Sequence, residues 1–308
     1  MFVVCGEALM DVYMGESTPT GLRLDARIGG SPLNVAQGLA RLARPAAFLS
    51  TLSTDAIGER LLASLVAEGV DTSLVLRSDA PSTLSVVSID ATGVPRYDFH
   101  GNGAADRQLT PGTLPALPAQ TRVLQLGSYA LVVEPVGSTL RALAASARAR
   151  CLIAYDPNVR LNVEPDIDRW RQVVEDMVSL AHLVKVSEED LALLYPGESP
   201  EQVAPRWLKR GAALVVVTRG GAGSSAWTAN AHAKAPSKPV KVIDTVGAGD
   251  TFQAALLTWL DDHDALAPAA LTTLADGQLD ALLRFAAQAA AITCSRRGAD
   301  MPRRCELP

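Results

Sequence analysis

Short apolar runs that alternate with stretches of helical periodicity are the feature of this sequence that most constrains its fold. Each run is about four residues long, and five are clear: 2–5, 123–126, 152–155, 183–186 and 214–217. Runs of this kind are typical of strands that are buried on both faces of a parallel sheet. They therefore predict a central, mostly parallel sheet.

The segments between these runs have the apolar spacing of amphipathic helices. One stripe is formed by Ile57, Leu61, Leu62, Leu65 and Val66. A second is formed by Ile167, Trp170, Val173, Val174, Met177 and Leu180. Strands that alternate with helices along the chain indicate an α/β fold.

Two stretches depart from this alternation and predict a smaller second sheet. Residues 22–28 alternate apolar and polar side chains, as a strand with one covered face does. Residues 83–99 have the pattern of two antiparallel strands, and Thr92 and Gly93 would form the turn between them. We expect this sheet to project from the main body as a lid.

The charge balance argues against a nucleic-acid-binding protein. The 308 residues include 28 Lys and Arg against 33 Asp and Glu, which gives a net charge of −5. Proteins that bind nucleic acids usually have a basic excess. A small anionic ligand needs only a local positive site and remains possible.

Cysteine spacing and hydropathy predict a cytoplasmic protein without a membrane partner. Cys5, Cys151, Cys294 and Cys305 are far apart and have no neighbouring histidines, so neither a zinc site nor a disulfide framework is expected. We expect buried, reduced thiols. No apolar run approaches the ~18 residues of a membrane helix, and the first residues carry no basic leader.

The segment Asp-Thr-Val-Gly-Ala-Gly-Asp at 244–250 carries the strongest chemical signal. It follows directly on a short β-type stretch that begins at Val242, and it leads into an apolar helix, 252–260. Glycines before a helix let its first amides approach an anion, and such amides could stabilise developing charge. Asp250 is either a helix-capping residue or a general base for a hydroxyl group, and Asp244 is either a turn residue or a cation ligand.

Other polar residues follow the predicted strands, where open parallel sheets bind their ligands. Asp11 could clamp a diol, Gly30 and Asn34 precede an apolar helix, and Arg160 could hold a phosphoryl or carboxylate group. Each also has a structural explanation. Asp11 could be a solvated loop residue, Gly30 and Asn34 could belong to a loop and helix start, and Arg160 could form a salt bridge. The glycine-rich loop 218–224 could wrap phosphates, but it matches neither the Walker nor the dinucleotide fingerprint.

Taken together, these segments resemble the ribokinase-like (PfkB) carbohydrate kinases nearly from end to end. The opening residues 6–11, the segment 29–36 and the segment 244–250 are similar to the family's sugar-binding acid and its two signatures. The resemblance implies one domain over residues 1–308. Its fold would be a three-layer sandwich with a central, mostly parallel sheet and a β-sheet lid formed by about 12–28 and 83–106.

The resemblance also implies roles for individual residues in an ATP-dependent sugar kinase. The catalytic residues would be Asp250 as base, with Gly247, Ala248 and Gly249 as the anion hole. The sugar would be bound by Asp11, Gly30, Asn34, Phe99, Arg160 and Asp250. The nucleotide would be bound by Lys185, Thr218, Gly220, Gly223 and Gly249. Mg²⁺ would accompany ATP near Asp190, and Asp244, Val246 and Gly298 would surround a monovalent cation such as K⁺.

Two departures from the family pattern bear on the substrate. Ser187 stands where many relatives have the Asn of a magnesium-linked motif, a change shared with fructokinases. Residues 99–106 lack the Arg that many relatives place near Gly101, which weakens the case for an acidic sugar and favours a neutral hexose. We therefore expect a fructokinase-like enzyme that phosphorylates a primary hydroxyl group, with a possible homodimer through the lid.

Other acceptors and other classes of protein stay open at this point. 2-Keto-3-deoxygluconate, ribose and a nucleoside are alternative acceptors, and Tyr97 and Phe99 could stack on a nucleobase. A sugar-binding regulator without catalysis is a different class, but Asp250 and both glycines of its motif argue against it. The missing dinucleotide fingerprint disfavours a dehydrogenase.

Overall fold

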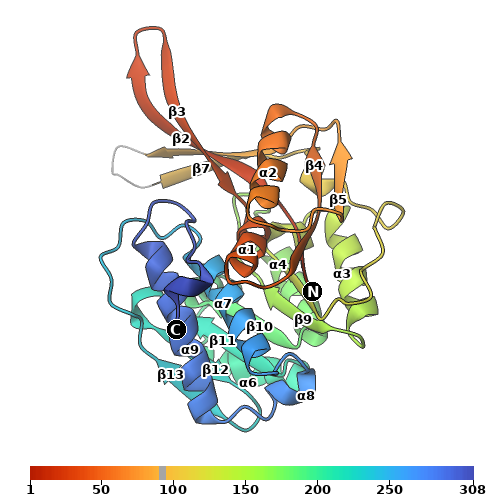
Figure 1. Ribbon diagram of the computed structural model, residues 1–308, viewed down its shortest axis with the longest axis vertical. Coiled ribbons are helices and arrows are strands. Elements are labelled where there is room, and N and C mark those ends of the chain that lie inside the picture. Colours follow the sequence, from red (N-terminus) through yellow and green to blue (C-terminus); the bar gives the residue numbers. More distant parts are fainter. Residues whose placement is uncertain (90–94) are drawn as a thin grey trace.

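A nine-stranded sheet forms the centre of the protein in a computed structural model that describes residues 1–89 and 95–308 (Figure 1). Its strand order is β13-β12-β11-β10-β9-β8-β1-β4-β5. The bounds are β1 (Phe2–Cys5), β4 (Ala46–Ser53), β5 (Val75–Ser78), β8 (Val123–Gly127), β9 (Leu152–Asp156), β10 (Leu183–Ser187), β11 (Leu214–Thr218), β12 (Ser224–Trp227) and β13 (His232–Ala235). All neighbours pair in parallel except β11–β12 and β12–β13, so the predicted mostly parallel sheet is confirmed.

Helices cover both faces of this sheet, which makes the predicted three-layer sandwich. The first face carries α1 (Ser31–Arg41), α2 (Ala56–Ala67), α7 (Ala248–Asp262), α8 (Pro268–Leu271) and α9 (Asp276–Cys294). The second face carries α3 (Val136–Ala147), α4 (Ile167–Leu180), α5 (Glu188–Leu194) and α6 (Pro200–Arg210). Each face has its own buried apolar cluster, because alternate strand residues point to opposite helical layers.

A second, four-stranded sheet is built from the two stretches that depart from the alternation. Its order is β3-β2-β6-β7, with β2 (Leu9–Thr18), β3 (Gly21–Gly29), β6 (Thr83–Ile89) and β7 (Pro95–His100). The β6–β7 pair is antiparallel as predicted, and β2 pairs with β6 in parallel. The predicted turn at Thr92 and Gly93 and the side chain of Tyr97 lie outside the described residues.

Strands β2 and β3 extend as a long hairpin beyond the rest of the chain (Figure 1). The expected one-sided strand at 22–28 is only partly correct, because β3 has no continuous buried face. Leu22 is 40% exposed and Leu24 is 59% exposed. The small sheet also begins earlier, at Leu9, and ends earlier, at His100, than residues 12–28 and 83–106.

Four strands of the large sheet are absent from the sequence prediction: β4, β5, β12 and β13. Strand β4 is wholly buried but contains Ser50, Thr51 and Ser53, which interrupt its apolar run. Strands β5 and β13 are short and lie at the two edges of the sheet. Polar or short strands of this kind leave a weak periodic signal.

The predicted β-type stretch that begins at Val242 is wrong. Val242 and Ile243 are 59% and 61% exposed, and the amide of Ile243 donates to the carbonyl of Cys294 at the end of α9. No described strand pairs with this segment, so its β-branched side chains remain on the surface. The helix that follows begins at Ala248 and not at Phe252, and its N-cap is Gly247 in the left-handed conformation (φ 76°).

The cysteine prediction is correct for pairing and only partly correct for burial. All four cysteines are free. Cys5 and Cys151 are buried, Cys294 is half-buried and Cys305 is exposed. Among the described helices, none combines the length and the apolar composition needed to cross a membrane.

Candidate active site

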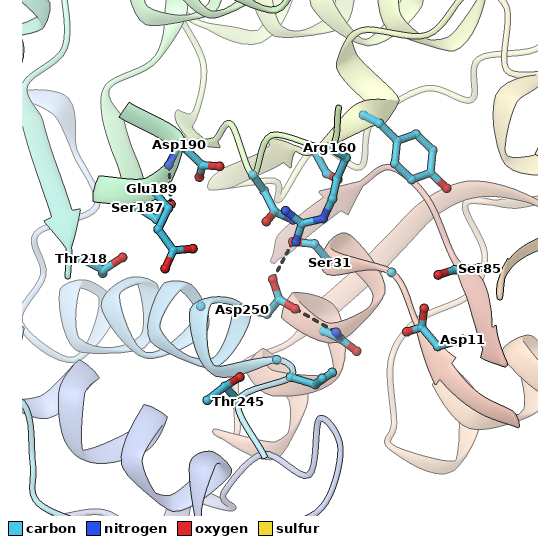
Figure 2. A pocket seen from close by; sticks show the side chains of 18 of the residues that line it. Asp11, Ser31, Ser85, Arg160, Ser187, Glu189, Asp190, Thr218, Thr245 and Asp250 are labelled. Atoms are coloured by element: carbon cyan, nitrogen blue, oxygen red, sulfur yellow. Dashed lines mark hydrogen bonds between the residues drawn. The ribbon is translucent and has the colours of Figure 1, made fainter. Parts of the chain in front are cut away.

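A cavity of about 860 Å³ lies where the small sheet faces the carboxyl ends of the central strands. Residues that follow β1, β8, β9, β10 and β11 line it, together with the start of α7. Open parallel sheets bind ligands at this edge. Figure 2 shows Asp250 between two groups of side chains. We call these the small-sheet end (Glu7, Asp11, Ser85 and Phe99) and the β10–β11 end (Lys185, 187–190 and 218–221).

Asp250 is held in place by side chains of α1. Its Oδ1 accepts a hydrogen bond from Ser31 Oγ at 2.6 Å, and its Oδ2 accepts one from Asn34 Nδ2 at 2.8 Å. Among the described residues, its carboxylate accepts hydrogen bonds from these two side chains and from no backbone amide of α7. The capping explanation is therefore wrong: both carboxylate oxygens are oriented by a different helix, at the edge of the cavity. Ser31 is missing from the sequence prediction.

The amides before and within the first turn of α7 are available to an anion, with one exception. The amide of Ala248 donates to the carbonyl of Thr245 at 3.2 Å, so Ala248 does not fit the predicted anion hole. Within the described chain, the amides of Gly247, Gly249 and Asp250 have no acceptor. The amide of Asp250 thus takes the place expected for Ala248. Free amides at a helix start attract negative charge.

Asp11 and Gly30 lie together at the small-sheet end. Asp11 projects from β2 and lines the cavity, and burial raises its pKa. A Cβ atom on Gly29 would lie 2.3 Å from Asp11 Oδ2, so the absence of a side chain there makes room for the carboxylate. Gly30 has φ 106°, a conformation that favours glycine, and it also lines the cavity.

Arg160 and Phe99 also line the cavity, as predicted. Arg160 is exposed, and its Nη1 donates to the neighbouring Val159 carbonyl at 2.8 Å. Phe99 contacts Tyr129 edge to face, with ring centroids 6.1 Å apart. An arginine does lie against Gly101: it is Arg107, whose guanidinium lies over Tyr129 and which is not among the described residues of the cavity wall.

Glu7 is a buried acid of the small-sheet end for which no separate role is predicted from the sequence. It is 1% exposed, and its Oε2 has no hydrogen-bond partner in the described structure. Burial raises the pKa of Glu7 to about 8, with a smaller lowering from Ser128 and a further increase from the Asp106 charge. Asp106 itself accepts hydrogen bonds from Thr83 at 2.5 Å and Tyr129 at 2.9 Å.

The β10–β11 end holds most of the residues expected at the nucleotide. Thr218 ends β11, and Gly220 follows it at the cavity wall. Gly223 does not fit the prediction, since it lies outside the described lining. A Cβ atom on Gly223 would come within 2.2 Å of the Ala235 carbonyl, so this glycine permits close packing against β13.

Lys185 and Asp156 form a buried ion pair beneath this end. Lys185 Nζ lies 2.6 Å from Asp156 Oδ2, and the two side chains are 5% and 4% exposed. Burial raises the pKa of Asp156 to about 6, and Lys185 opposes that increase. Lys185 lines the cavity as predicted, but its partner Asp156 is missing from the sequence prediction.

Acidic residues at the start of α5 offer oxygen ligands of the kind Mg²⁺ prefers. Glu188, Glu189 and Asp190 line the cavity, and Ser187 caps the helix through its hydroxyl. Asp190 Oδ1 accepts the Val159 amide at 3.0 Å. The described residues contain no group of three His, Cys, Asp or Glu side chains that could hold a metal alone.

The three residues expected around a monovalent cation do lie together. Asp244 Oδ1 accepts the Val246 amide at 3.1 Å, and Oδ2 accepts the Gly298 amide at 2.9 Å. Arg27 Nη1 is 3.6 Å from the same Oδ2. Asp244 thus joins the loop before α7 to the segment after α9, whatever else it binds.

Comparison with known proteins shows what this chain is similar to. The profile of the pfkB family carbohydrate kinases matches residues 1–304. A fructokinase of Rhizobium leguminosarum bv. trifolii is 36% identical over 260 residues, which are 84% of this chain and 79% of the relative. The structure of a fructokinase with bound ATP from Xylella fastidiosa superposes with a TM-score of 0.88 at 25% identity, covering 100% of this chain and 94% of the other. The structure of a Vibrio cholerae O395 fructokinase double mutant, in a form with fructose, ADP and potassium ion bound, superposes with a TM-score of 0.82 at 27% identity. The match covers 97% of this chain and 93% of the other.

Proposed function

Because this chain belongs to the pfkB family of carbohydrate kinases and is an ATP-dependent sugar kinase, we propose that its acceptor is fructose and that Asp250 is the base. The names of its relatives support the acceptor. The observation that carries the role of Asp250 is its geometry. Its carboxylate is aligned by Ser31 and Asn34 beside free amides at the start of α7.

The proposed reaction is an in-line phosphoryl transfer. A sugar hydroxyl oxygen forms a bond to the γ-phosphorus, and the bond from that phosphorus to the β–γ bridging oxygen breaks, so ADP leaves with the electron pair. Asp250 accepts the hydroxyl proton. The amides of Gly247, Gly249 and Asp250 stabilise charge on the transferred group.

The wall of the cavity supports a neutral polyol over an acidic sugar. Asp11 stands at the small-sheet end, and Arg160 is the cation among its described neighbours in the cavity wall. Hydroxyl groups can donate to a carboxylate, whereas a sugar acid would be repelled by it. 2-Keto-3-deoxygluconate, ribose and nucleosides are the alternative acceptors, and a non-catalytic sugar-binding protein is the alternative function.

ATP and its ions belong to the same proposal. Thr218 and Gly220 would contact the nucleotide, and Glu189 and Asp190 would hold Mg²⁺, which neutralises phosphate charge when it is bound. The potassium ion bound to the Vibrio cholerae fructokinase supports a similar ion near Asp244 and the Val246 carbonyl. The small sheet would act as a lid, since Asp11, Ser85 and Phe99 project from it into the cavity wall.

A homodimer through the small sheet is a further part of the proposal. The β2–β3 hairpin extends outward and exposes Met14, Leu22 and Leu24 at 43%, 40% and 59%. Exposed apolar side chains on a long hairpin mark an interaction surface. Leu24→Glu should convert a dimer to a monomer in analytical ultracentrifugation. A monomeric wild-type chain would remove this part of the proposal.

The test of function is ADP release with Mg²⁺ and ATP against a panel of sugars, each with K⁺ or Na⁺. The panel holds fructose, glucose, ribose, 2-keto-3-deoxygluconate and adenosine. Turnover on fructose at the lowest KM is expected. Preference for another sugar of the panel would overturn the assignment of fructose as the acceptor. Binding of sugar and ATP without turnover would support the non-catalytic alternative.

A further inference from the structure

Arg27 forms an ion pair between the small sheet and the loop before α7. It lies on β3, directly opposite Asp11 in the β2–β3 register, and such cross-strand neighbours share one face of a sheet. Its Nη1 is 3.6 Å from Asp244 Oδ2. Among the described residues, this is the one ion pair that joins the small sheet to the rest of the chain.

The small sheet itself holds the guanidinium group of Arg27 in place. Asp25 Oδ2 accepts hydrogen bonds from Arg27 Nε at 3.0 Å and from Nη2 at 2.5 Å. The guanidinium carbon lies 4.6 Å from the centroid of the Tyr13 ring. Asp25 and Tyr13 are also opposite each other in the β2–β3 register. A planar group held at two nitrogens and against one ring has little freedom to rotate, so its third nitrogen faces Asp244 in a defined direction.

Asp244 in turn holds the four residues that precede α7, 244–247, which we call the α7 loop. Its carboxylate accepts the amides of Val246 at 3.1 Å and Gly298 at 2.9 Å. Gly247, at the end of this loop, rests on the same segment after α9, since a Cβ atom on it would lie 2.6 Å from Ala299 Cβ. The position of Asp244 therefore decides where the free amide of Gly247 points.

The contact of Arg27 with this region is broader than the ion pair. Arg27 Cδ lies 3.9 Å from the place of a Cβ atom on Gly298, so the arginine side chain also packs against the segment after α9. One side chain thus connects the strand opposite Asp11 to the residues that hold the α7 loop. A misplacement of about 1 Å between reacting groups can cost ~10²-fold in rate.

We propose that Arg27 is a positioning residue that couples sugar binding at the small sheet to the arrangement of the α7 loop that receives the phosphoryl group. This rests on the proposed kinase reaction, in which Asp11 binds the sugar and the amides at the start of α7 stabilise the transferred group. Arg27 contacts neither substrate. It acts through Asp244, because Asp244 is the member of the α7 loop with which it forms an ion pair.

Two other effects of the same charge have to be separated from this role. Arg27 opposes the increase in the pKa of Asp11 that burial causes, so its loss could act on the sugar through Asp11 alone. Its guanidinium group also lies beside Asp244, where a monovalent cation is proposed, so its loss could simply remove positive charge. The experiments below give different results for the three roles.

The first measurement is the affinity for fructose by calorimetry, with and without Mg²⁺ and the non-hydrolysable ATP analogue that has an imido β–γ bridge. In the wild type we expect the analogue to raise the affinity for fructose about tenfold, an ordinary size for coupling between two sites. In Arg27→Met this ratio should fall below about twofold, because the connection between the sites is lost. A wild type without coupling, or a folded variant that keeps the full ratio, would overturn the proposal.

The second measurement is a double-mutant cycle on kcat with Arg27→Met, Asp244→Asn and the double variant. Arg27→Met should lower kcat about tenfold in the wild-type background, since the α7 loop is less well placed. When residue 244 is already Asn, the same change should alter kcat less than about twofold. A loss of equal size in both backgrounds would show that Arg27 acts elsewhere, as through Asp11, and the proposal would be wrong.

Potassium separates a connection from a charge. The kcat values of wild type and Arg27→Met are measured from low to high K⁺ concentration, with Na⁺ keeping the ionic strength constant. We expect K⁺ to raise both values by the same factor, because an ion brings charge to Asp244 but does not attach it to the small sheet. Restoration of wild-type kcat in Arg27→Met by K⁺ would show that Arg27 supplies charge alone and would overturn the proposal.

Arg44→Met is the matched control for folding. Arg44 is also a half-buried arginine, and its ion pair with Asp261, with a closest N–O distance of 2.7 Å, joins distant segments of the chain away from the cavity. Surface ion pairs of this kind contribute little to stability, so both variants should fold. Arg44→Met should keep the wild-type ratio of fructose affinities. A reduced ratio in Arg44→Met would show that the ratio reports stability in general and would remove the assignment to Arg27.

The outcome is distinguishable from failure of the proposed function. If the wild type phosphorylates another sugar of the panel, the choice of fructose fails, and the ratio and the cycle are measured with that sugar. If it phosphorylates none, the kinase proposal fails. The ratio of sugar affinities with and without the ATP analogue then still decides whether Arg27 couples the two sites.

Discussion

One buried carboxyl group lies in the cavity wall at the small-sheet end and another lies beneath the β10–β11 end, and among the described residues only the second contacts a cation. Glu7 is 1% exposed and forms no ion pair with any described residue, and burial raises its pKa to about 8. Asp156 is 3% exposed and contacts Lys185, which limits the increase to a pKa of about 6. Each has one oxygen without a described partner. Burial raises the pKa of both acids, and the contact with Lys185 opposes that increase at Asp156.

The difference matches the chemistry proposed for each end. A neutral acid beside the sugar can both donate and accept hydrogen bonds, as hydroxyl groups do. An ion pair beside the phosphates can supply a fixed positive charge. Asp250 lies between the two ends, where the sugar hydroxyl and the phosphoryl group would meet.

The largest expected effect comes from removing the negative charge of Asp250, which lies between the small-sheet end and the β10–β11 end of the cavity. Asp250→Asn keeps hydrogen-bond partners for Ser31 and Asn34 but cannot accept a proton. We expect kcat to fall by about 10²–10⁴-fold, the range typical of a general base. The affinity for ATP should be unchanged in calorimetry. A variant with wild-type kcat would show that Asp250 is not the base.

A change at the small-sheet end should show its effect in stability rather than in the phosphoryl transfer. The pKa of Glu7 is higher in the folded protein, about 8 against 4.5, so the folded state binds the extra proton. Its stabilising contribution is complete below pH 4.5 and is lost as the pH rises through 8. At alkaline pH, Glu7→Gln should therefore have a free energy of unfolding several kcal/mol higher than that of wild type.

Urea unfolding at pH 5, 7 and 9 measures this effect. The difference in the free energy of unfolding between Glu7→Gln and wild type should grow in favour of the variant as the pH rises. Glu7→Asp keeps a titrating carboxyl group and serves as the matched control. Parallel pH profiles for wild type and Glu7→Gln would show that Glu7 is charged in the folded protein.

A buried histidine outside the cavity gives the opposite pH dependence and sharpens the assignment to Glu7. His182 is 4% exposed, its Nδ1 accepts the Ile153 amide at 3.0 Å, and burial lowers its pKa to about 4. The unfolded chain binds the proton first, so the contribution of His182 is present above pH 6.5 and is lost as the pH falls toward 4.

His182→Asn should therefore flatten the acid side of the stability profile and leave the alkaline side as in wild type. The effect is up to about 3 kcal/mol at 1.36 kcal/mol per pKa unit. Urea unfolding between pH 4 and 7 measures it, and His263→Asn, at an exposed position, is the control. An unchanged acid slope would show that another group is responsible.

The smallest expected effect comes from crowding the β10–β11 end. Gly249→Ala would place a Cβ atom 3.1 Å from Lys185 Nζ, a tight contact that the flexible lysine can relieve by moving. We expect kcat to fall severalfold. Gly277→Ala is the matched control, because it is also a glycine-to-alanine change in a helix, α9, and has open space around the added atom. It should leave kcat unchanged. Equal kcat values for the two variants would show that the lysine position is not critical.

The central sheet and much of the cavity are predictable from the sequence because their signals are local. Each buried strand is an apolar run, and the glycines before α7 and the polar residues after β9 stand next to recognisable elements. The prediction fails where the signal is not local. The exposed Val242 and Ile243 have the composition of a strand but lack a neighbouring strand among the described elements. Gly223 has the composition of a phosphate loop but packs against β13.

The α/β class, the second sheet and the choice of Asp250 as a candidate base can all be read from the amino-acid sequence. Periodicity and short motifs carry these, since they depend on residues a few positions apart. The folded chain was needed to show that Ser31 and Asn34 orient Asp250, that Ala248 is not a free donor, and that Glu7 and Asp156 are buried. Hydrogen bonding and charge in a buried site depend on groups from distant segments, such as residues 34 and 250, that meet only when the sheet and its helices assemble.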